Sequence, residues 1–284
     1  MQDLRITIIQ SDLHWENIDA NLKMFSRKIS TIREKTDLIV LPEMFSTGFT
    51  MKNKAMAEKM DGKTVQWMRN MAKEKKCVIT GSLIIKENGK YYNRLIWMMP
   101  NGEYKTYDKR HLFRYANEQN YYAAGKKKLI VELKGCKICP MICYDLRFPV
   151  WSRNNYPLFI SPKGGNKHVQ PPSPWEKDGM GCYDVLLYIA NWPERRNHPW
   201  KTLLMARAME NQCYVVGVNR VGNDGNNIYH SGDSAAINFK GEILSKTKGR
   251  KESVETVILS MKDLDTWRKK FPAWMDSDRF KLTS

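Results

Sequence analysis

Apolar positions recur with two different periods along this chain, and the change of period predicts where strands and helices lie. Residues 4–10 form an apolar run that suits a buried first strand. Residues 15–35 instead carry apolar side chains at spacings of four and three, which predicts an amphipathic helix. These apolar positions are Ile18, Leu22, Phe25, Ile29 and Ile32.

Short apolar runs elsewhere predict the remaining strands. They cover residues 37–41, 77–85, 91–98, 129–133, 137–142, 185–190, 213–218, 234–239 and 254–259. Asn88-Gly89 lies between two of these runs and is a strong signal for a hairpin. Further helices are expected over residues 62–75, 147–154 and 199–211. Because helices and strands alternate throughout, the fold class is α/β or layered α+β.

Length and composition suit one large domain over residues 1–284. The chain is 42% hydrophobic but has no run of about 18 apolar residues. Its start also lacks a basic segment leading into an apolar stretch. Six cysteines without a regular framework are typical of reduced thiols. We therefore expect a cytoplasmic protein with no membrane span.

The formal net charge of +17 raises the question of nucleic-acid binding, because strongly basic proteins often bind polyanions. The lysines are scattered, however, and acidic residues lie among most of them. No recognised nucleic-acid motif is present. Solvated surface charge is therefore the better interpretation, and nucleic acid is not expected to be the main partner.

Cys143 stands where an apolar run ends abruptly and the chain turns polar. If a tight turn and a helix follow that strand, the thiol is held outward on a rigid support. Backbone N–H groups of the turn then point toward a developing oxyanion, and a helix N-terminus favours the thiolate. The alternative is a buried structural thiol, since free cysteine is among the most buried residue types.

Two further chemical groups follow predicted elements. Glu43 comes after Pro42 at the end of the run 37–41, and Lys109 follows the hairpin in a segment where charged and aromatic residues meet. Taken singly, Glu43 could be a solvated carboxylate and Lys109 one of many surface lysines. Together with Cys143 they place three reactive side chains at element ends, where catalytic groups are usually displayed.

A metal site is the rival interpretation, because Cys136, Cys139 and Cys143 form a C-x-x-C-x-x-x-C pattern. On a strand, Cys136 faces the side opposite to the other two, whereas metal ligands must converge. His111 and His168 are isolated. Phosphate-binding, dinucleotide-binding and zinc-protease motifs are also absent from the sequence. We therefore expect no metal and no organic cofactor.

Three motifs carry a family resemblance. Leu-Pro-Glu-Met-Phe around Glu43, Tyr-Asp-Lys-Arg-His-Leu-Phe around Lys109 and Cys-Tyr-Asp-Leu-Arg-Phe-Pro around Cys143 resemble the Glu-Lys-Cys signature of the nitrilase (carbon–nitrogen hydrolase) superfamily. The pattern is most similar to the ω-amidase branch. The resemblance continues through Asn117-Glu118, Tyr122-x-x-Gly125 and residues 191–196, 206–211 and 230–232.

This resemblance implies a four-layer α-β-β-α sandwich that forms a homodimer and needs no cofactor. It also implies an amidase that releases ammonia from 2-oxoglutaramate or 2-oxosuccinamate through a cysteine thioester. In that chemistry Cys143 is the nucleophile and Glu43 the general base. Lys109 and the backbone N–H of Tyr144 hold the oxyanion, while Glu118 positions Lys109.

Arg147 is the candidate for substrate specificity. It lies four residues after Cys143, in the first turn of the expected helix, where a cation is unfavourable. A salt bridge to Asp145, a solvated side chain, or a grip on the far carboxylate of the substrate could each explain it. The hypothesis is that Arg147 anchors the α-keto carboxylate while Phe113 and Trp192 line the chain between; Arg195 or Arg196 is the alternative anchor.

Residues 157–182 depart from the family pattern and are predicted to be an insertion on the surface or at a subunit contact. The sequence leaves other functions open. The substrate could be another small amide, a carbamoyl compound or a nitrile. Alternatively, the chain could be an inactive nucleic-acid-associated binding protein, and ammonia release separates these classes.

Overall fold

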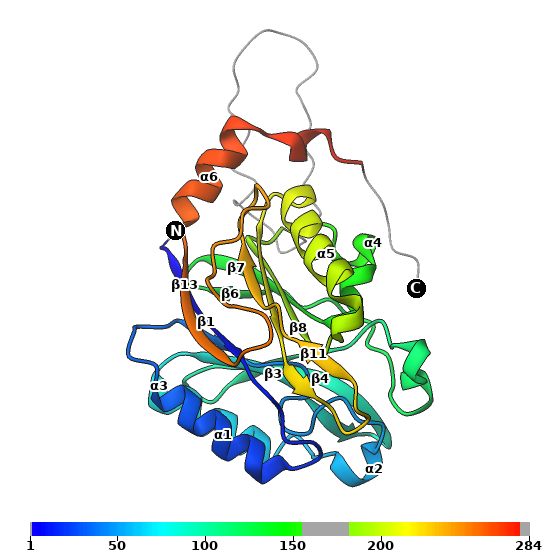
Figure 1. Cartoon of the computed structure of the whole chain (residues 1–284). Coiled ribbons are helices and arrows are strands. Elements are labelled where there is room, and N and C mark those ends of the chain that lie inside the picture. The colour runs from blue at the N-terminus through cyan, green and yellow to red at the C-terminus, as the bar shows by residue number, and fades with distance from the viewer. Residues whose placement is uncertain (1, 155–181, 279–284) are drawn as a thin grey trace, which may run out of the picture.

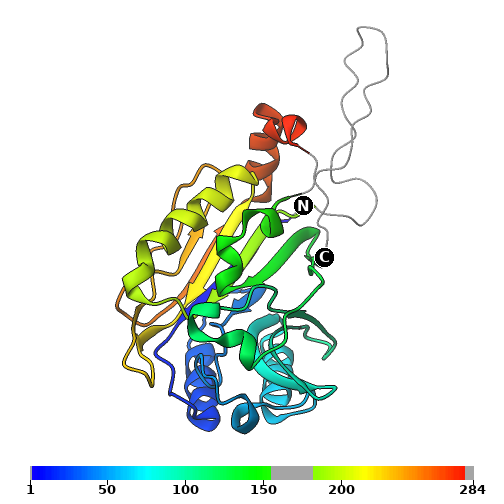
Figure 2. The same cartoon turned by 90° about the vertical axis from the view of Figure 1, so that its right-hand side faces the viewer.

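The computed structural model describes residues 2–154 and 182–278. Almost all of the predicted insertion at 157–182 therefore lies outside the described residues. Two sheets stack face to face, with helices covering their outer faces (Figures 1 and 2). This arrangement is the predicted four-layer α-β-β-α sandwich.

The first sheet has six strands in the order β13-β1-β2-β3-β4-β5. Their bounds are β1 Leu4–Gln10, β2 Leu38–Val40, β3 Val78–Glu87, β4 Lys90–Met98, β5 Tyr104–Asp108 and β13 Ser253–Leu259. β1, β2 and β3 are parallel, whereas β3, β4 and β5 form an antiparallel meander through the expected hairpin. β13 closes the other edge antiparallel to β1.

The second sheet has five strands in the order β12-β9-β8-β7-β6. Their bounds are β6 Val131–Leu133, β7 Cys136–Ile142, β8 Val185–Ala190, β9 Tyr214–Asn219 and β12 Ala235–Ile237. β7, β8 and β9 are parallel, so their carboxyl ends lie at the same edge. A separate pair joins β10 (Val221–Asn223) to β11 (Tyr229–Ser231).

Helices cover both outer faces. α1 (Ile18–Ser30) and α3 (Lys63–Lys75) pack on the six-stranded sheet, and α5 (Asn197–Glu210) packs on the five-stranded sheet on the opposite side of the molecule (Figures 1 and 2). The shorter helices are α2 Asn53–Met56, α4 Pro149–Ser152 and α6 Met261–Lys270. Single 3₁₀ turns span η1 Arg114–Ala116, η2 Glu118–Asn120, η3 Cys143–Arg147, η4 Glu194–Arg196 and η5 Ala273–Asp276. Within residues 2–154 and 182–278, no helix is long and apolar enough to cross a membrane.

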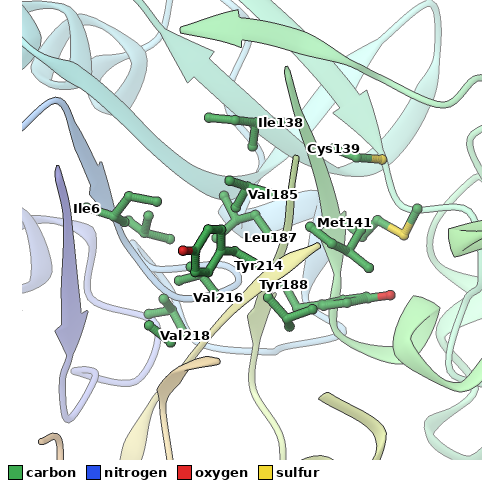
Figure 3. Close-up of a cluster of buried hydrophobic side chains, with 14 of the residues drawn as sticks. Ile6, Ile138, Cys139, Met141, Val185, Leu187, Tyr188, Tyr214, Val216 and Val218 are labelled. Atoms are coloured by element: carbon green, nitrogen blue, oxygen red, sulfur yellow. The ribbon is translucent and has the colours of Figure 1, made fainter. Parts of the chain in front are cut away.

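The main hydrophobic core lies between the two sheets. Ile6 of β1 belongs to the same buried cluster as Val185 and Val216 of β8 and β9, as Figure 3 shows. Every residue of β8 is buried because this strand is covered on both faces. That double burial explains why residues 185–190 show a continuous apolar run instead of an alternation.

Some predicted elements have different bounds. The helix expected over residues 15–35 is shorter, because the side chain of Asn17 accepts a hydrogen bond from the Ala20 N–H and caps α1. The helix expected over residues 147–154 is present but reduced to α4, because the chain forms η3, breaks at Phe148 and starts α4 at Pro149. A proline suits a first turn and interrupts a helix that began earlier. The sequence pattern also did not identify β5 or α6.

Candidate active site

The candidate site lies at the ends of strands from both sheets. Glu43 follows β2, Lys109 directly follows β5, and Cys143 directly follows β7. Asn191, which sequence reasoning did not select, directly follows β8, the parallel neighbour of β7. Stacking the two sheets therefore brings together residues that are far apart along the chain.

Lys109 is the centre of a buried ionic cluster. Its Nζ lies 2.8 Å from Oε1 of Glu43 and 3.1 and 3.0 Å from the two carboxylate oxygens of Glu118. The Lys109 side chain is 1% exposed and both glutamates are fully buried. The structure thus brings Glu43, Lys109 and Glu118 into direct contact.

Two asparagines complete the surroundings of Glu43. Nδ2 of Asn93 donates to Glu43 Oε1 at 2.8 Å, and the backbone N–H of Asn191 donates to Oε2 at 2.8 Å. Asn93 Nδ2 also lies 3.5 Å from Oε1 of Glu118. These donors matter because two buried carboxylates share a single ammonium. Asn93 is a polar residue inside the apolar run 91–98, and that signal could have identified it.

Cys143 is buried beside this cluster, and its thiol donates to the carbonyl oxygen of Asn191 with an Sγ–O distance of 3.9 Å. Burial raises the pKa of the Cys143 thiol well above its usual range, and Glu43 raises it further, while Lys109 acts in the opposite direction. Lys109 thus favours the thiolate, but its effect is the smaller one in the resting state. The helix N-terminus that was expected to favour the thiolate is replaced by the 3₁₀ turn η3. The thiol is protonated there, because burial and Glu43 outweigh the lysine.

The charge states of the cluster have identifiable causes. Burial alone would lower the pKa of Lys109, but Glu118 and Glu43 raise it, so the ammonium form persists. Burial raises the pKa of Glu118, with Lys109 opposing and Glu43 adding to the shift. The Cys143 thiol and the Lys109 ammonium therefore both keep their protons in the resting site.

The backbone at Cys143 turns sharply. Its φ of 45° is unusual for a non-glycine residue, and the five-residue turn η3 begins with Cys143 itself. The expected tight turn after a strand is thus present at Cys143, with a 3₁₀ turn in place of an α-helix. Tyr144, whose N–H is the expected oxyanion donor, is the second residue of this turn.

Asp145 holds this turn in place and was not among the predicted site residues. Its fully buried carboxylate accepts from Tyr107 Oη at 2.7 Å and the Ile142 N–H at 3.0 Å through Oδ2. Its Oδ1 accepts the His111 N–H at 3.0 Å and lies 2.8 Å from His111 Nδ1. Asp145 therefore ties the strand end before Cys143 to both sides of Lys109.

A cavity of about 580 Å³ opens over these groups. Glu43, Lys109 and Cys143 line it together with the predicted substrate residues Arg147, Phe113 and Trp192. The guanidinium of Arg147 lies over the Trp192 ring at 5.1 Å. The backbone N–H of Phe113 donates to Glu118 Oε2 at 2.6 Å, which connects the cavity wall to the buried cluster.

The structure changes the argument for Arg147. This residue ends η3 and does not begin an α-helix, so the assumed conflict with a helix N-terminus does not exist. A salt bridge to Asp145 is also excluded, since the Asp145 carboxylate bonds to Tyr107, Ile142 and His111. Arg147 forms no ion pair with any residue that the structure describes. Its guanidinium is left on the cavity wall.

Cys136 and Cys139 are buried in β7, away from any metal-binding arrangement. Within the described ranges, no group of three or more His, Cys, Asp or Glu side chains is placed to hold a metal ion. The chemistry available at the site is that of a thiol, a carboxylate base and a lysine cation.

This fold, with a buried thiol beside a Glu–Lys–Glu cluster, belongs to a class of hydrolases that act on carbon–nitrogen bonds. The chain belongs to the carbon–nitrogen hydrolase family, whose family model matches residues 5–269. This confirms the resemblance to the nitrilase superfamily and the fold that it implied.

Named relatives cover nearly the whole chain. The chain is 42% identical to omega-amidase YafV of Escherichia coli over 99% of its length and 100% of that protein. It is 31% identical to 2-oxoglutaramate amidase of Bacillus subtilis over 95% of this chain and 96% of the relative. The crystal structure of XC1258, a CN-hydrolase superfamily protein from Xanthomonas campestris, superposes with a TM-score of 0.88 at 42% identity, covering 100% of both chains.

Proposed function

We propose that this protein is an amidase that hydrolyses the terminal amide of small 2-oxo acids, 2-oxoglutaramate or 2-oxosuccinamate, to acid plus ammonia. The observation that carries the proposal is the buried contact of Lys109 with Glu43 and Glu118 beside the Cys143 thiol. The cavity above them is lined by arginines that form no ion pair with any described residue. The names of the relatives, omega-amidase and 2-oxoglutaramate amidase, support the same substrate class.

In the first half of the reaction Glu43 takes the proton of Cys143 as the sulfur attacks the amide carbon. The raised pKa of the thiol makes this coupled transfer necessary, since little thiolate exists beforehand. Lys109 and the Tyr144 N–H hold the negative oxygen of the tetrahedral intermediate, each such donor contributing about 3 to 4 kcal/mol. Glu43 returns the proton to the nitrogen, ammonia leaves, and a thioester remains.

In the second half a water molecule attacks the thioester carbon while Glu43 accepts its proton. The same two donors stabilise the second tetrahedral intermediate. Its collapse breaks the carbon–sulfur bond, and the proton returns from Glu43 to sulfur, which restores the thiol and releases the acid. Glu118 holds Lys109 throughout by its two hydrogen bonds.

Arg147 anchors the substrate carboxylate in this proposal. A guanidinium matches a carboxylate with two parallel hydrogen bonds, and Arg147 has no competing acidic partner in the described part of the chain. Phe113 and Trp192 line the space between, so that the ω-amide reaches Cys143. Charge-assisted bonds contribute about 1.5 to 3 kcal/mol, so Arg147→Lys should lose on the order of tenfold or more in kcat/KM on 2-oxoglutaramate. An uncharged amide such as hexanamide should lose much less.

The test is ammonia release by the purified protein from ω-amides of 2-oxo acids, amino-acid amides, carbamoyl compounds and nitriles. The proposal expects 2-oxoglutaramate or 2-oxosuccinamate to give the highest kcat/KM, and Cys143→Ala to abolish turnover while remaining folded. Residual turnover above about a tenth of wild type would remove Cys143 as nucleophile. Nitrile hydrolysis at a comparable rate would indicate a nitrilase. Salt-sensitive polyanion binding with no ammonia release would indicate a binding protein.

We also propose that the protein is a cytoplasmic homodimer. Cys77, Cys136, Cys139, Cys143 and Cys213 are buried free thiols, as suits a reducing compartment. Two-fold dimers are the commonest closed assembly of soluble proteins. Light scattering on the eluting peak of a gel-filtration column measures the mass directly, and a monomer of 33.2 kDa would contradict the dimer.

A further inference from the structure

Three arginines on the wall of the cavity have no acidic partner in the parts of the chain that the structure describes. Arg147, Arg195 and Arg196 all line the cavity that contains Cys143, and none forms an ion pair with a described residue. They are held instead against aromatic rings. The guanidinium of Arg196 lies 5.2 Å from the ring centre of Phe113 and 5.6 Å from that of Tyr115. Stacking fixes the position of a guanidinium without neutralising it.

The other charges on the cavity wall largely cancel. Glu16 pairs with Lys52 at 2.8 Å, and Glu43 pairs with Lys109 at 2.8 Å. Asp224 is the remaining carboxylate among the lining residues, and its Oδ1 accepts two backbone N–H groups of its own loop. The three arginines therefore leave the cavity with an excess of positive charge.

Arg196 is the best placed of the three to act beside Arg147. Its carbonyl oxygen accepts a hydrogen bond of 2.6 Å from Nε1 of Trp192, the ring on which Arg147 lies. Burial lowers the pKa of Arg196, and the like charges of Arg195 and Arg147 lower it further, whereas Cys143 raises it. Arg196 thus lies within electrostatic reach of both Arg147 and the thiol.

We propose that Arg196 is a specificity-determining residue that selects 2-oxo acid amides and rejects 2-amino acid amides. This inference rests on the proposed function and adds a residue role to it. The 2-position of the substrate is bonded to the carboxylate that Arg147 binds, so its substituent lies at the arginine end of the cavity. A 2-oxo oxygen accepts a hydrogen bond from a guanidinium, whereas a 2-ammonium group carries the same sign of charge and is repelled.

The size of the effect follows from Coulomb's law. The Arg196 guanidinium and a 2-ammonium group are taken as two unit charges about 6 Å apart at an effective dielectric constant of about 20. Their repulsion would weaken binding of the 2-amino acid amide on the order of a hundredfold. Partial exposure and salt reduce this, so about tenfold is the expected minimum. The selection should therefore weaken as ionic strength rises, which a purely steric effect would not do.

The experiment compares four amides: 2-oxoglutaramate, glutaramate, L-glutamine and uncharged hexanamide. The test variants are Arg196→Gln, which removes the charge, and Arg196→Lys, which keeps it. Arg114→Gln is the matched control, because Arg114 is exposed and does not line the cavity. Where turnover of an amide is too slow, its inhibition constant against hexanamide hydrolysis replaces kcat/KM.

For Arg196→Gln we expect kcat/KM on 2-oxoglutaramate to fall about tenfold. The ratio of L-glutamine to glutaramate should rise by about tenfold or more. Arg196→Lys should keep the wild-type ratio because the charge remains, and Arg114→Gln should leave every ratio unchanged.

Equal losses on all four amides in Arg196→Gln would show that Arg196 serves the fold of the cavity and would overturn the inference. An unchanged ratio of L-glutamine to glutaramate would overturn it as well. Failure of the proposed function looks different. In that case wild type does not prefer 2-oxoglutaramate, while the glutamine-to-glutaramate ratio still responds to the charge at Arg196.

Discussion

Replacing Asp145 by asparagine tests how the reactive turn is held. The carboxylate accepts hydrogen bonds from Tyr107 and Ile142 on one oxygen. Its other oxygen accepts the His111 backbone N–H and lies 2.8 Å from His111 Nδ1. An asparagine side chain has only one oxygen. Whichever way the amide is turned, its NH₂ group faces one of these two pairs of groups.

The structure sets the expected magnitude. Each buried donor left without an acceptor costs about 1 to 3 kcal/mol, so two of them lower the free energy of unfolding by roughly 2 to 6 kcal/mol. For a chain of this size that corresponds to a fall in Tm on the order of 10 °C. Ile142 precedes Cys143, and His111 lies two residues after Lys109. The Cys143 thiol and the Lys109 ammonium should therefore also lose their alignment. A misplacement near 1 Å can cost about a hundredfold, so we expect kcat to fall by about ten- to a hundredfold with little change in KM.

The assay combines thermal unfolding with steady-state ammonia release. Tyr107→Phe removes a single donor to Asp145 and the acceptor of Trp151 Nε1, and should have a smaller effect of the same kind. Asp19→Asn is the control, since this side chain is 74% exposed and its ion pair is with surface Lys63. Wild-type Tm and kcat in Asp145→Asn would refute the reasoning. A lowered Tm with unchanged kcat would show that Asp145 stabilises the turn without positioning it.

Three further outcomes are expected. Glu43→Gln should suppress ammonia release nearly as completely as Cys143→Ala, because an amide cannot take the thiol proton; a thioester trapped at the normal rate would place the base elsewhere. Gly125→Ala should lower Tm in a thermal melt, because the added Cβ would lie 2.1 Å from the backbone oxygen of Asp108, next to Lys109; an unchanged Tm would contradict this. Burial, together with Arg220, lowers the pKa of His230 from 6.5 to about 4, so the unfolded chain takes up a proton before the native protein does as the pH falls. The free energy of unfolding should therefore fall below pH 6.5 by up to about 1.4 kcal/mol per pH unit, and urea titrations of His230→Gln should lack that contribution.

The sequence by itself determined the layered α/β class and the family. Buried parallel strands such as β8 must be apolar on both faces, so residues 185–190 could be recognised without knowing their neighbours. The motifs around Glu43, Lys109 and Cys143 are each a short continuous stretch of sequence, so the family resemblance could be recognised without the structure. The helix expected over residues 147–154 is shorter in the structure, because Pro149 starts a new helical turn and does not continue η3.

Only the tertiary structure decided how the site is held together. Asn93 and Asn191 donate to Glu43 across 50 and 148 positions of sequence, and no local pattern encodes such a contact. The protonated state of Cys143 likewise depends on its burial and on the approach of Glu43. Hydrogen bonds and desolvation depend on which groups lie within a few ångströms in space, whereas hydrophobic periodicity and motifs depend only on the order of residues along the chain. For this reason the reactive residues could be named from the sequence, but their partners, their charges and the arginines gathered around them appeared only when the two sheets were stacked.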